Sequence, residues 1–142
     1  MPSRRRISPA LRQRLAEAAG HACSYCRSPS LAGIPLAVDH IIPLAAGGSD
    51  QRGNLCLACY RCNEFKGTQS VGWDPLTKAE TPLFHPNQQS WANHFAWSQN
   101  GLLLVPLSAV GRVTLHTLRM NDEWLQQARR IWMLAGIHPP LS

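Results

Sequence analysis

The spacing of apolar residues is most informative over residues 36–67 of this chain. Residues 36–41 have the apolar character of a strand, and residues 54–57 indicate a shorter strand that returns beside it. The polar stretch over residues 45–53 contains two consecutive glycines and is typical of a loop. From residue 58 to residue 67 the spacing becomes helical, and a glycine stands where the helix would end. The pattern therefore predicts strand, loop, strand and helix, in that order.

Further elements are predicted on both sides of this segment. Ser8 and Pro9 suit the N-cap and first position of a helix, which Gly20 would end. Beyond the segment, turn signals give way to an aromatic-rich region. The elements expected there are a helix over 88–97, a strand over 102–107, a helix over 108–120 and a last helix capped by Asn121.

The last helix has a clear apolar stripe. Asp122 and Glu123 stand at its beginning, where the positive end of the helix dipole favours acidic residues. The apolar residues that follow recur at i, i+4 and i+7, the spacing of a core-facing surface. We expect this stripe to be buried; it consists of Trp124, Leu125, Ala128, Ile131, Trp132 and Ala135.

These elements predict an α+β protein with a small ββα core. The chain has 142 residues and 44% hydrophobic content, enough for one modest core. Its expected parts are a basic arm with a helix (1–20), the ββα core (21–70) and a mainly helical extension packed on it (71–142). The sequence shows neither an N-terminal apolar h-region nor a run of about 18 apolar residues, so we expect no membrane helix and a cytoplasmic location. Nothing in the sequence fixes the oligomeric state.

The charge is positive and unevenly spread. The net charge is +6 and the pI about 9.6. Residues 1–70 carry nine Lys and Arg against four Asp and Glu, whereas residues 71–142 carry five against four. Such a bias favours a polyanionic partner such as nucleic acid, although a merely solvated basic surface would have the same composition. Arg52 and Arg61 lie closest to the ββα core and are expected to contact phosphate, whereas the arginines at positions 4, 5, 6, 12 and 14 fit either role.

Five cysteines in a predicted cytosolic chain favour metal binding over disulfides. Two Cys-x-x-Cys pairs, Cys23 with Cys26 and Cys59 with Cys62, can each present two thiolates to one tetrahedral Zn²⁺. Cys56 leaves an alternative open, because Cys56 and Cys59 have the same spacing. The sequence therefore predicts one structural zinc ion and one spare cysteine.

A second set of polar residues suits phosphodiester hydrolysis. Asp39 and Asn63 offer the oxygen ligands that Mg²⁺ or Mn²⁺ takes. An imidazole can take a proton from water, so His40 is the candidate general base, provided that a twist or bulge brings it to the same side of the strand as Asp39. Lys66 lies at i+3 from Asn63 and is expected to contact a substrate phosphate. Asn54 is better placed to bind loop backbone than metal.

Residues 36–67, with the first cysteine pair before them, resemble the HNH (His-Asn-His) family of ββα-metal endonucleases. The resemblance implies that Asp39 and Asn63 hold the catalytic metal ion, that His40 is the general base and that Asn54 is the middle Asn. It also places the second cysteine pair directly before the last Asn of the motif, which assigns Cys59 and Cys62 to zinc and makes Cys56 a buried strand residue. The implied function is a metal-dependent endonuclease acting on DNA, expected to be double-stranded, that leaves 5′-phosphate and 3′-hydroxyl ends.

Two other interpretations remain. A non-catalytic zinc module would bind nucleic acid through the basic half, but it has no need of Asp39, His40 and Asn63 together. A protein-interaction role ranks third. The aromatic residues at positions 91, 95 and 97 could stack on exposed bases, but we expect them to pack the extension onto the core, with His94 as a hydrogen-bonded neighbour.

Overall fold

The computed structural model describes residues 7–140. The basic arm predicted at the N-terminus therefore lies, up to residue 6, outside the described residues. The helices are α1 (Pro9–Ala18), α2 (Tyr60–Lys66), α3 (Ala109–Thr117) and α4 (Glu123–Leu134). The strands are β1 (Leu36–His40), β2 (Leu55–Cys59), β3 (Val71–Asp74), β4 (Ala79–Pro82), β5 (Phe95–Trp97) and β6 (Leu104–Pro106), each paired with its neighbour in the chain as a two-stranded antiparallel sheet. The predicted α+β class is confirmed.

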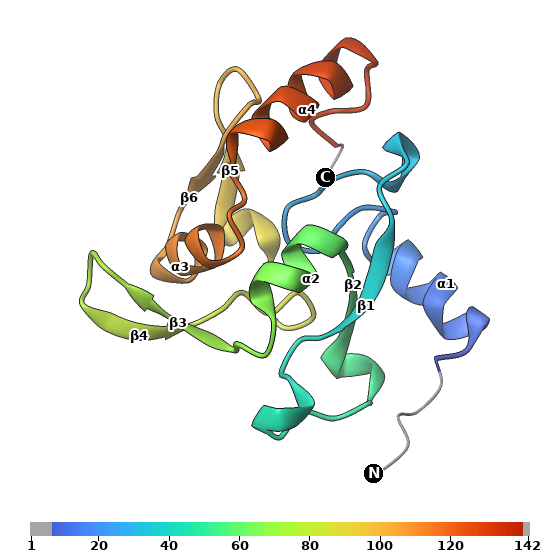
Figure 1. Cartoon of the computed structure of the whole chain (residues 1–142), viewed down its shortest axis with the longest axis vertical. Helices are drawn as coiled ribbons and strands as arrows, with labels where there is room; N and C mark the ends of the chain where they lie inside the picture. Colours follow the sequence, from blue (N-terminus) through green and yellow to red (C-terminus); the bar gives the residue numbers. More distant parts are fainter. Residues whose placement is uncertain (1–6, 141–142) are drawn as a thin grey trace.

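The ββα unit forms as predicted. Strand β1 pairs with β2 in an unbroken register from Leu36 opposite Cys59 to His40 opposite Leu55. Helix α2 follows β2 without a loop, because Cys59 serves as its N-cap and accepts a hydrogen bond from the Cys62 amide at 3.5 Å. In Figure 1 this helix and the hairpin lie side by side at the centre of the molecule.

Helix α1 begins and ends as the sequence predicts. The Ser8 side chain accepts a hydrogen bond from the Leu11 amide at 3.1 Å, and Pro9 takes the first helical position. Gly20 has φ +64°, a conformation that favours glycine and stops the helix. Leu15 is the buried residue of this helix and packs in the core.

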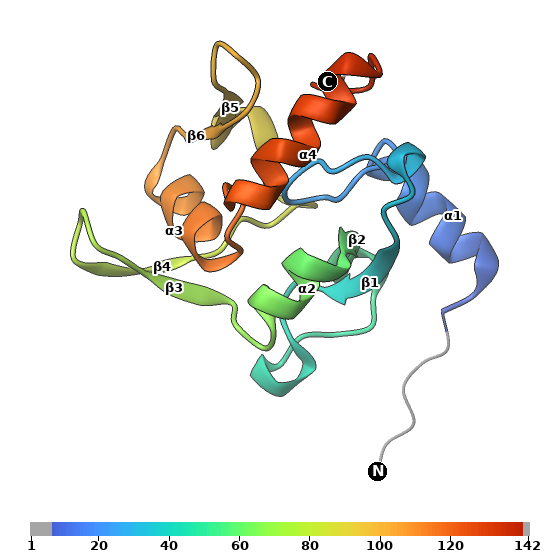
Figure 2. The same cartoon turned by 45° about the horizontal axis from the view of Figure 1, so that its top comes forward.

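The first part of the extension, residues 71–97, differs from its prediction in two places. Residues 71–82, expected to be turns, form the β3–β4 hairpin, which projects from the body in both views (Figures 1 and 2). Asp74 stabilises its turn by accepting from the Leu76 amide and the Thr77 hydroxyl, and it pairs with Arg112 at 2.9 Å. These hydrogen bonds, above all the one from Arg112, hold the pKa of Asp74 well below its usual range.

The helix predicted over 88–97 is wrong, because this stretch holds a short 3₁₀ turn and strand β5 paired with β6.

Helix α4 forms, but its buried face is narrower than predicted. Its N-cap is Asp122 rather than Asn121. The buried positions are Leu125, Arg129 and Trp132, whereas Ile131 is 64% exposed. Arg129 reaches the core because its guanidinium donates to carbonyl oxygens of neighbouring segments, including that of Leu102 at 2.8 Å. A pattern of apolar residues alone does not reveal such a buried, hydrogen-bonded cation.

One cluster of buried residues connects the two halves of the chain. It includes Leu15 of α1, Leu55 of β2, Leu104 of β6 and Leu118 just after α3. The extension thus packs against the ββα unit and fixes its position. Among residues 7–140, none of the helices combines the length and apolar character that crossing a bilayer requires.

Candidate functional site

Four cysteines gather where the loop after α1 meets the start of α2. Their sulfur atoms all lie within 4.8 Å of one another, and all four side chains are buried; they are Cys23, Cys26, Cys59 and Cys62. The Cys26 and Cys59 sulfurs are 3.7 Å apart, close to the roughly 3.8 Å edge of a tetrahedron with Zn–S bonds of about 2.3 Å. Burial raises the pKa of the Cys23 thiol, so a cation would be needed to keep it as thiolate. The donor set therefore suits a tetrahedral zinc ion.

Cys56 lies outside this cluster. Its sulfur is 3.8 Å from Asp39 Oδ2 and 3.8 Å from the Tyr25 hydroxyl, on the inner side of the hairpin. Burial raises its pKa to about 12, which keeps the thiol neutral beside the carboxylate. The choice of Cys59 and Cys62 as the second pair, with Cys56 as a buried strand residue, is confirmed by the cluster.

Asp39 is buried between the hairpin and α2. Its Oδ2 accepts a 2.7 Å hydrogen bond from the Tyr25 hydroxyl, and its Oδ1 lies 3.4 Å from Asn63 Nδ2 and 3.3 Å from Lys66 Nζ. The Asn63 side chain thus neighbours the carboxylate and turns its amide nitrogen toward it. Tyr25 was missed from the sequence, where it stands between two cysteines and gave no sign of contact with Asp39.

His40 is held by a residue that the sequence did not single out. Its Nε2 lies 2.7 Å from Oδ1 of Asp50, in the loop between β1 and β2. Sequence reasoning overlooked Asp50 because it lies ten residues from His40, in a polar loop whose path the sequence does not reveal. The contact fixes the plane of the imidazole, and an ionised Asp50 favours the tautomer of the neutral ring that carries its proton on Nε2 and its lone pair on Nδ1.

The loop that carries Asp50 is fastened by Asn54. The Asn54 side chain accepts from the Ile42 amide at 2.8 Å and donates to the carbonyl oxygens of Ile42 and Ser49 at 2.9 and 2.8 Å. These are the loop-backbone contacts expected of Asn54. Gly48 sits so close that an added Cβ would lie 1.7 Å from the Ile42 carbonyl oxygen. The loop can follow this path only with glycine at position 48.

A cleft of about 400 Å³ joins these groups. It is bordered by Asp39, His40 and Asn63, by Pro43 and the turn after it, and by the residues at the end of α2. Of the twist or bulge expected at the end of β1, the bulge is absent, because the strand keeps its register to the last residue. Asp39 and His40 still border the same cleft, since it extends around the end of the strand.

The three cations expected to contact substrate are placed differently from one another. Lys66 is 1% exposed. Its ammonium contacts the Asp39 carboxylate at 3.3 Å and donates to the His40 carbonyl oxygen at 2.9 Å. Arg61 pairs with Asp122 at 3.0 Å and so ties α2 to α4. Neither offers a free cation to the cleft, because both are already paired within the protein. Arg52 is exposed on a 3₁₀ turn, and its contact with phosphate stays a prediction.

The aromatic residues of the extension pack against the core as predicted. Phe95 is 1% exposed, and Trp91 and Trp97 lie against the same buried cluster. His94 is a hydrogen-bonded neighbour, with Nδ1 2.6 Å from the Ser108 hydroxyl. Trp91 also borders a separate polar pocket of about 140 Å³.

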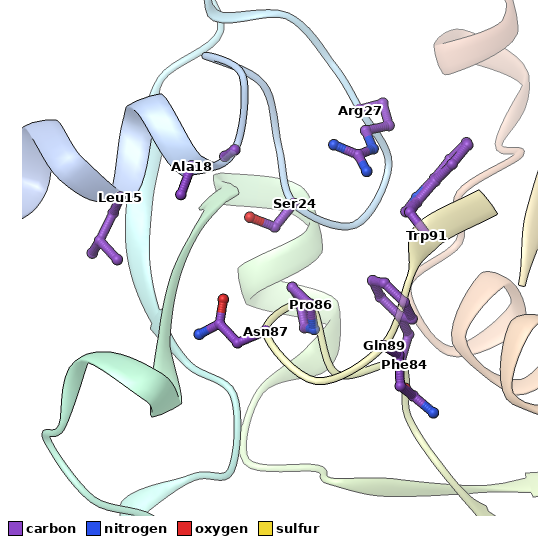
Figure 3. A pocket seen from close by; sticks show the side chains of 10 residues that line it. Leu15, Ala18, Ser24, Arg27, Phe84, Pro86, Asn87, Gln89 and Trp91 are labelled. Atoms are coloured by element: carbon purple, nitrogen blue, oxygen red, sulfur yellow. The ribbon is translucent and has the colours of Figure 1, made fainter. Parts of the chain in front are cut away.

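That polar pocket lies between α1 and the loop before β5. Figure 3 shows Arg27 and Trp91 on one side of it and Leu15 and Ala18 of α1 on the other. The Arg27 guanidinium lies 4.9 Å from the centre of the Trp91 ring, and burial lowers its pKa. The pocket shares no lining residue with the cleft and takes no part in the site described above.

The hairpin and the helix after it bring a carboxylate, an amide and an imidazole to one cleft. This is the arrangement that the resemblance to ββα-metal nucleases implies. Residues 23–69 match the family model for HNH endonucleases. Over 60 residues, 41% of this chain, the sequence is 42% identical to the CRISPR-associated endonuclease Cas9 of Corynebacterium diphtheriae. The chain spans about 5% of the length of that relative. No solved structure matches the chain. The resemblance to the HNH family is thus confirmed for residues 23–69.

Proposed function

We propose that the protein is an endonuclease that hydrolyses phosphodiester bonds in DNA with the aid of one Mg²⁺ or Mn²⁺ ion. The observation that carries this proposal is the arrangement of Asp39, Asn63 and His40 around one cleft. The HNH family match supports nuclease chemistry on nucleic acid. Double-stranded DNA as substrate and a cytoplasmic location are parts of the proposal that rest on the sequence.

Asp39 and Asn63 would hold the divalent ion through oxygen atoms. When bound, the ion would stabilise the negative charge that develops on the phosphate. Lys66 supports this site from behind, because its buried ammonium balances the Asp39 carboxylate. Tyr25 holds the other carboxylate oxygen and keeps the Asp39 side chain in one orientation.

His40 is the proposed general base, and Nδ1 is the atom that takes the proton from water. Asp50 accepts a hydrogen bond from the protonated Nε2 of His40 and would stabilise the imidazolium that forms. Asn54 and Gly48 hold the Asp50 loop in place and so position the base indirectly. The chain would thus supply the base, its orienting carboxylate and the ligands of one ion, while a zinc ion at the cysteine cluster would tie the loop after α1 to the start of α2.

Plasmid nicking tests the proposal. Purified protein should convert supercoiled plasmid to the open circle with Mg²⁺ or Mn²⁺ and not with chelator present. His40→Ala should lower the rate by about 10²- to 10⁴-fold, the usual contribution of a general base, with zinc content and circular dichroism unchanged. Metal-dependent nicking at the wild-type rate by this variant would refute His40 as the base. Binding of DNA without any nicking would favour the non-catalytic zinc module instead.

A further inference from the structure

The first turn of α2 borders an apolar pocket of about 160 Å³ that is separate from the cleft. Helix α2 supplies Tyr60 and Arg61 to its lining, and α4 supplies Trp124 and Trp132. Tyr60 is 61% exposed and Trp124 is 48% exposed. Two half-exposed aromatic rings beside an apolar pocket form a surface on which a flat ring can stack.

Arg61 adds a positive charge to the wall of this pocket. Its guanidinium lies 4.3 Å from the centre of the Trp124 ring, and its Nη2 is paired with Asp122. Its Nη1 is buried and has no acceptor among residues 7–140. This atom faces the protein interior, so Arg61 offers the pocket the positive charge of its guanidinium, which favours an occupant with acceptor atoms over a purely hydrocarbon one.

The pocket and the cleft lie along one face of α2. Tyr60, Asn63 and Gly67 are spaced i, i+3 and i+7, which places them on the same side of the helix. Tyr60 borders the pocket, and Asn63 and Gly67 border the cleft. Seven residues of helix span about 10 Å, which equals about three rises of a stacked nucleic-acid strand at roughly 3.4 Å each.

We propose that this pocket binds an unpaired pyrimidine base of the strand that is cut in the cleft. This inference rests on the proposed nuclease function and adds a substrate class to it. The base would stack on Tyr60 and Trp124 and turn its polar ring edge toward the Arg61 guanidinium. A cavity of about 150 Å³ holds one benzene-sized ring, so the pocket volume matches a pyrimidine and is small for a purine. The preferred substrate then has an unpaired nucleotide within a few positions of the cleaved bond.

The test measures binding separately from cleavage. Fluorescence anisotropy compares a short labelled oligothymidine, an oligodeoxyadenosine and an abasic oligonucleotide of the same length, each with His40→Ala protein so that no cleavage intervenes. Oligothymidine should bind most tightly. Adding Tyr60→Ala or Trp124→Ala should weaken its binding about tenfold, as expected for the loss of a stacking partner, and leave the abasic oligonucleotide unaffected. Tyr60→Phe, which keeps the ring, should bind as tightly as the His40→Ala parent.

A matched control is available on the β3–β4 hairpin. Trp73 is 59% exposed and does not border the pocket, so Trp73→Ala should leave oligothymidine binding unchanged. Equal losses on the thymidine and abasic oligonucleotides, or undiminished binding by Tyr60→Ala, would overturn the inference. Because Tyr60 is largely exposed, its variants decide the matter even if Trp124→Ala fails to fold.

Plasmid nicking then separates the two proposals. If Tyr60→Ala in the chain with His40 intact nicks plasmid while base binding shows no dependence on Tyr60, the pocket inference fails and the nuclease stands. If base binding depends on Tyr60 but no metal-dependent nicking is found, the nuclease proposal fails and the pocket remains a base-binding site.

Discussion

The cysteine cluster and the cleft lie on the same hairpin and helix, yet they are built in opposite ways. The four cysteines are buried, with their sulfurs within 4.8 Å of one another. The cleft is open over about 400 Å³, and Asn63 and His40 on its border are only partly buried. A structural metal site gains from excluding water and exchange, whereas a catalytic site must admit substrate and water. The difference suits the cluster to a structural role and the cleft to the turnover that we propose.

Helix α2 joins the two sites. The cleft depends on the cysteine cluster, whereas the cluster does not depend on the cleft. Cys59 caps the helix and Cys62 lies in its first turn, directly before Asn63. The cluster therefore fixes the helix that carries Asn63 and Lys66. Loss of zinc should disable both sites, whereas changes in the cleft should leave the cluster intact.

The largest expected effect is loss of the zinc ion. Removal by a strong chelator, or Cys26→Ser, should unfold the ββα unit, because structural zinc contributes roughly 10 kcal/mol or more to the folding of small zinc domains. Circular dichroism and metal analysis check this, with chelator-treated protein expected to regain its fold when zinc is restored. A fully folded, zinc-free protein would show that the cluster is dispensable and would remove the contrast between the two sites.

A smaller effect is expected from Asp50→Asn, which alters only the cleft. The variant should nick plasmid roughly 10- to 100-fold more slowly, since it loses the charge that stabilises the protonated His40, part of what a general base contributes. Zinc content and melting temperature should remain close to wild type, because Asp50 is partly exposed in a surface loop. A wild-type rate would mean that the His40–Asp50 contact has no part in the chemistry.

The smallest effect is expected from Cys56→Ser, which lies between the two sites. Its hydroxyl replaces a neutral thiol that is not among the four clustered cysteines, so the protein should still bind one zinc ion. Burying a hydroxyl costs about 1–3 kcal/mol unless it finds a partner, and here Tyr25 and Asp39 are close. Metal analysis of the purified variant checks the prediction. Loss of zinc would assign Cys56 to the cluster after all.

The same contrast explains what the sequence predicted well. The ββα segment is dominated by fixed local spacings, such as the two cysteine pairs and the glycine after α2, and its elements appear in the structure in the predicted order. Asp50 and Tyr25 escaped notice because their roles depend on contacts with residues distant from them in the sequence. In the extension, Phe95 and Trp97 form a strand because they pair with β6, and Arg129 is buried because carbonyl oxygens converge on it. Such tertiary contacts leave little trace in periodicity.

Binding of Mn²⁺ at the cleft tests the central claim most directly. Electron paramagnetic resonance can count Mn²⁺ bound to zinc-loaded protein, in the wild type and in Asn63→Ala and Asp39→Asn. We predict one bound ion per wild-type chain and clearly weaker binding in both variants, because the Asp39 carboxylate and the Asn63 amide would share the ion. Absence of binding in the wild type, or undiminished binding in both variants, would contradict the proposed role of the cleft.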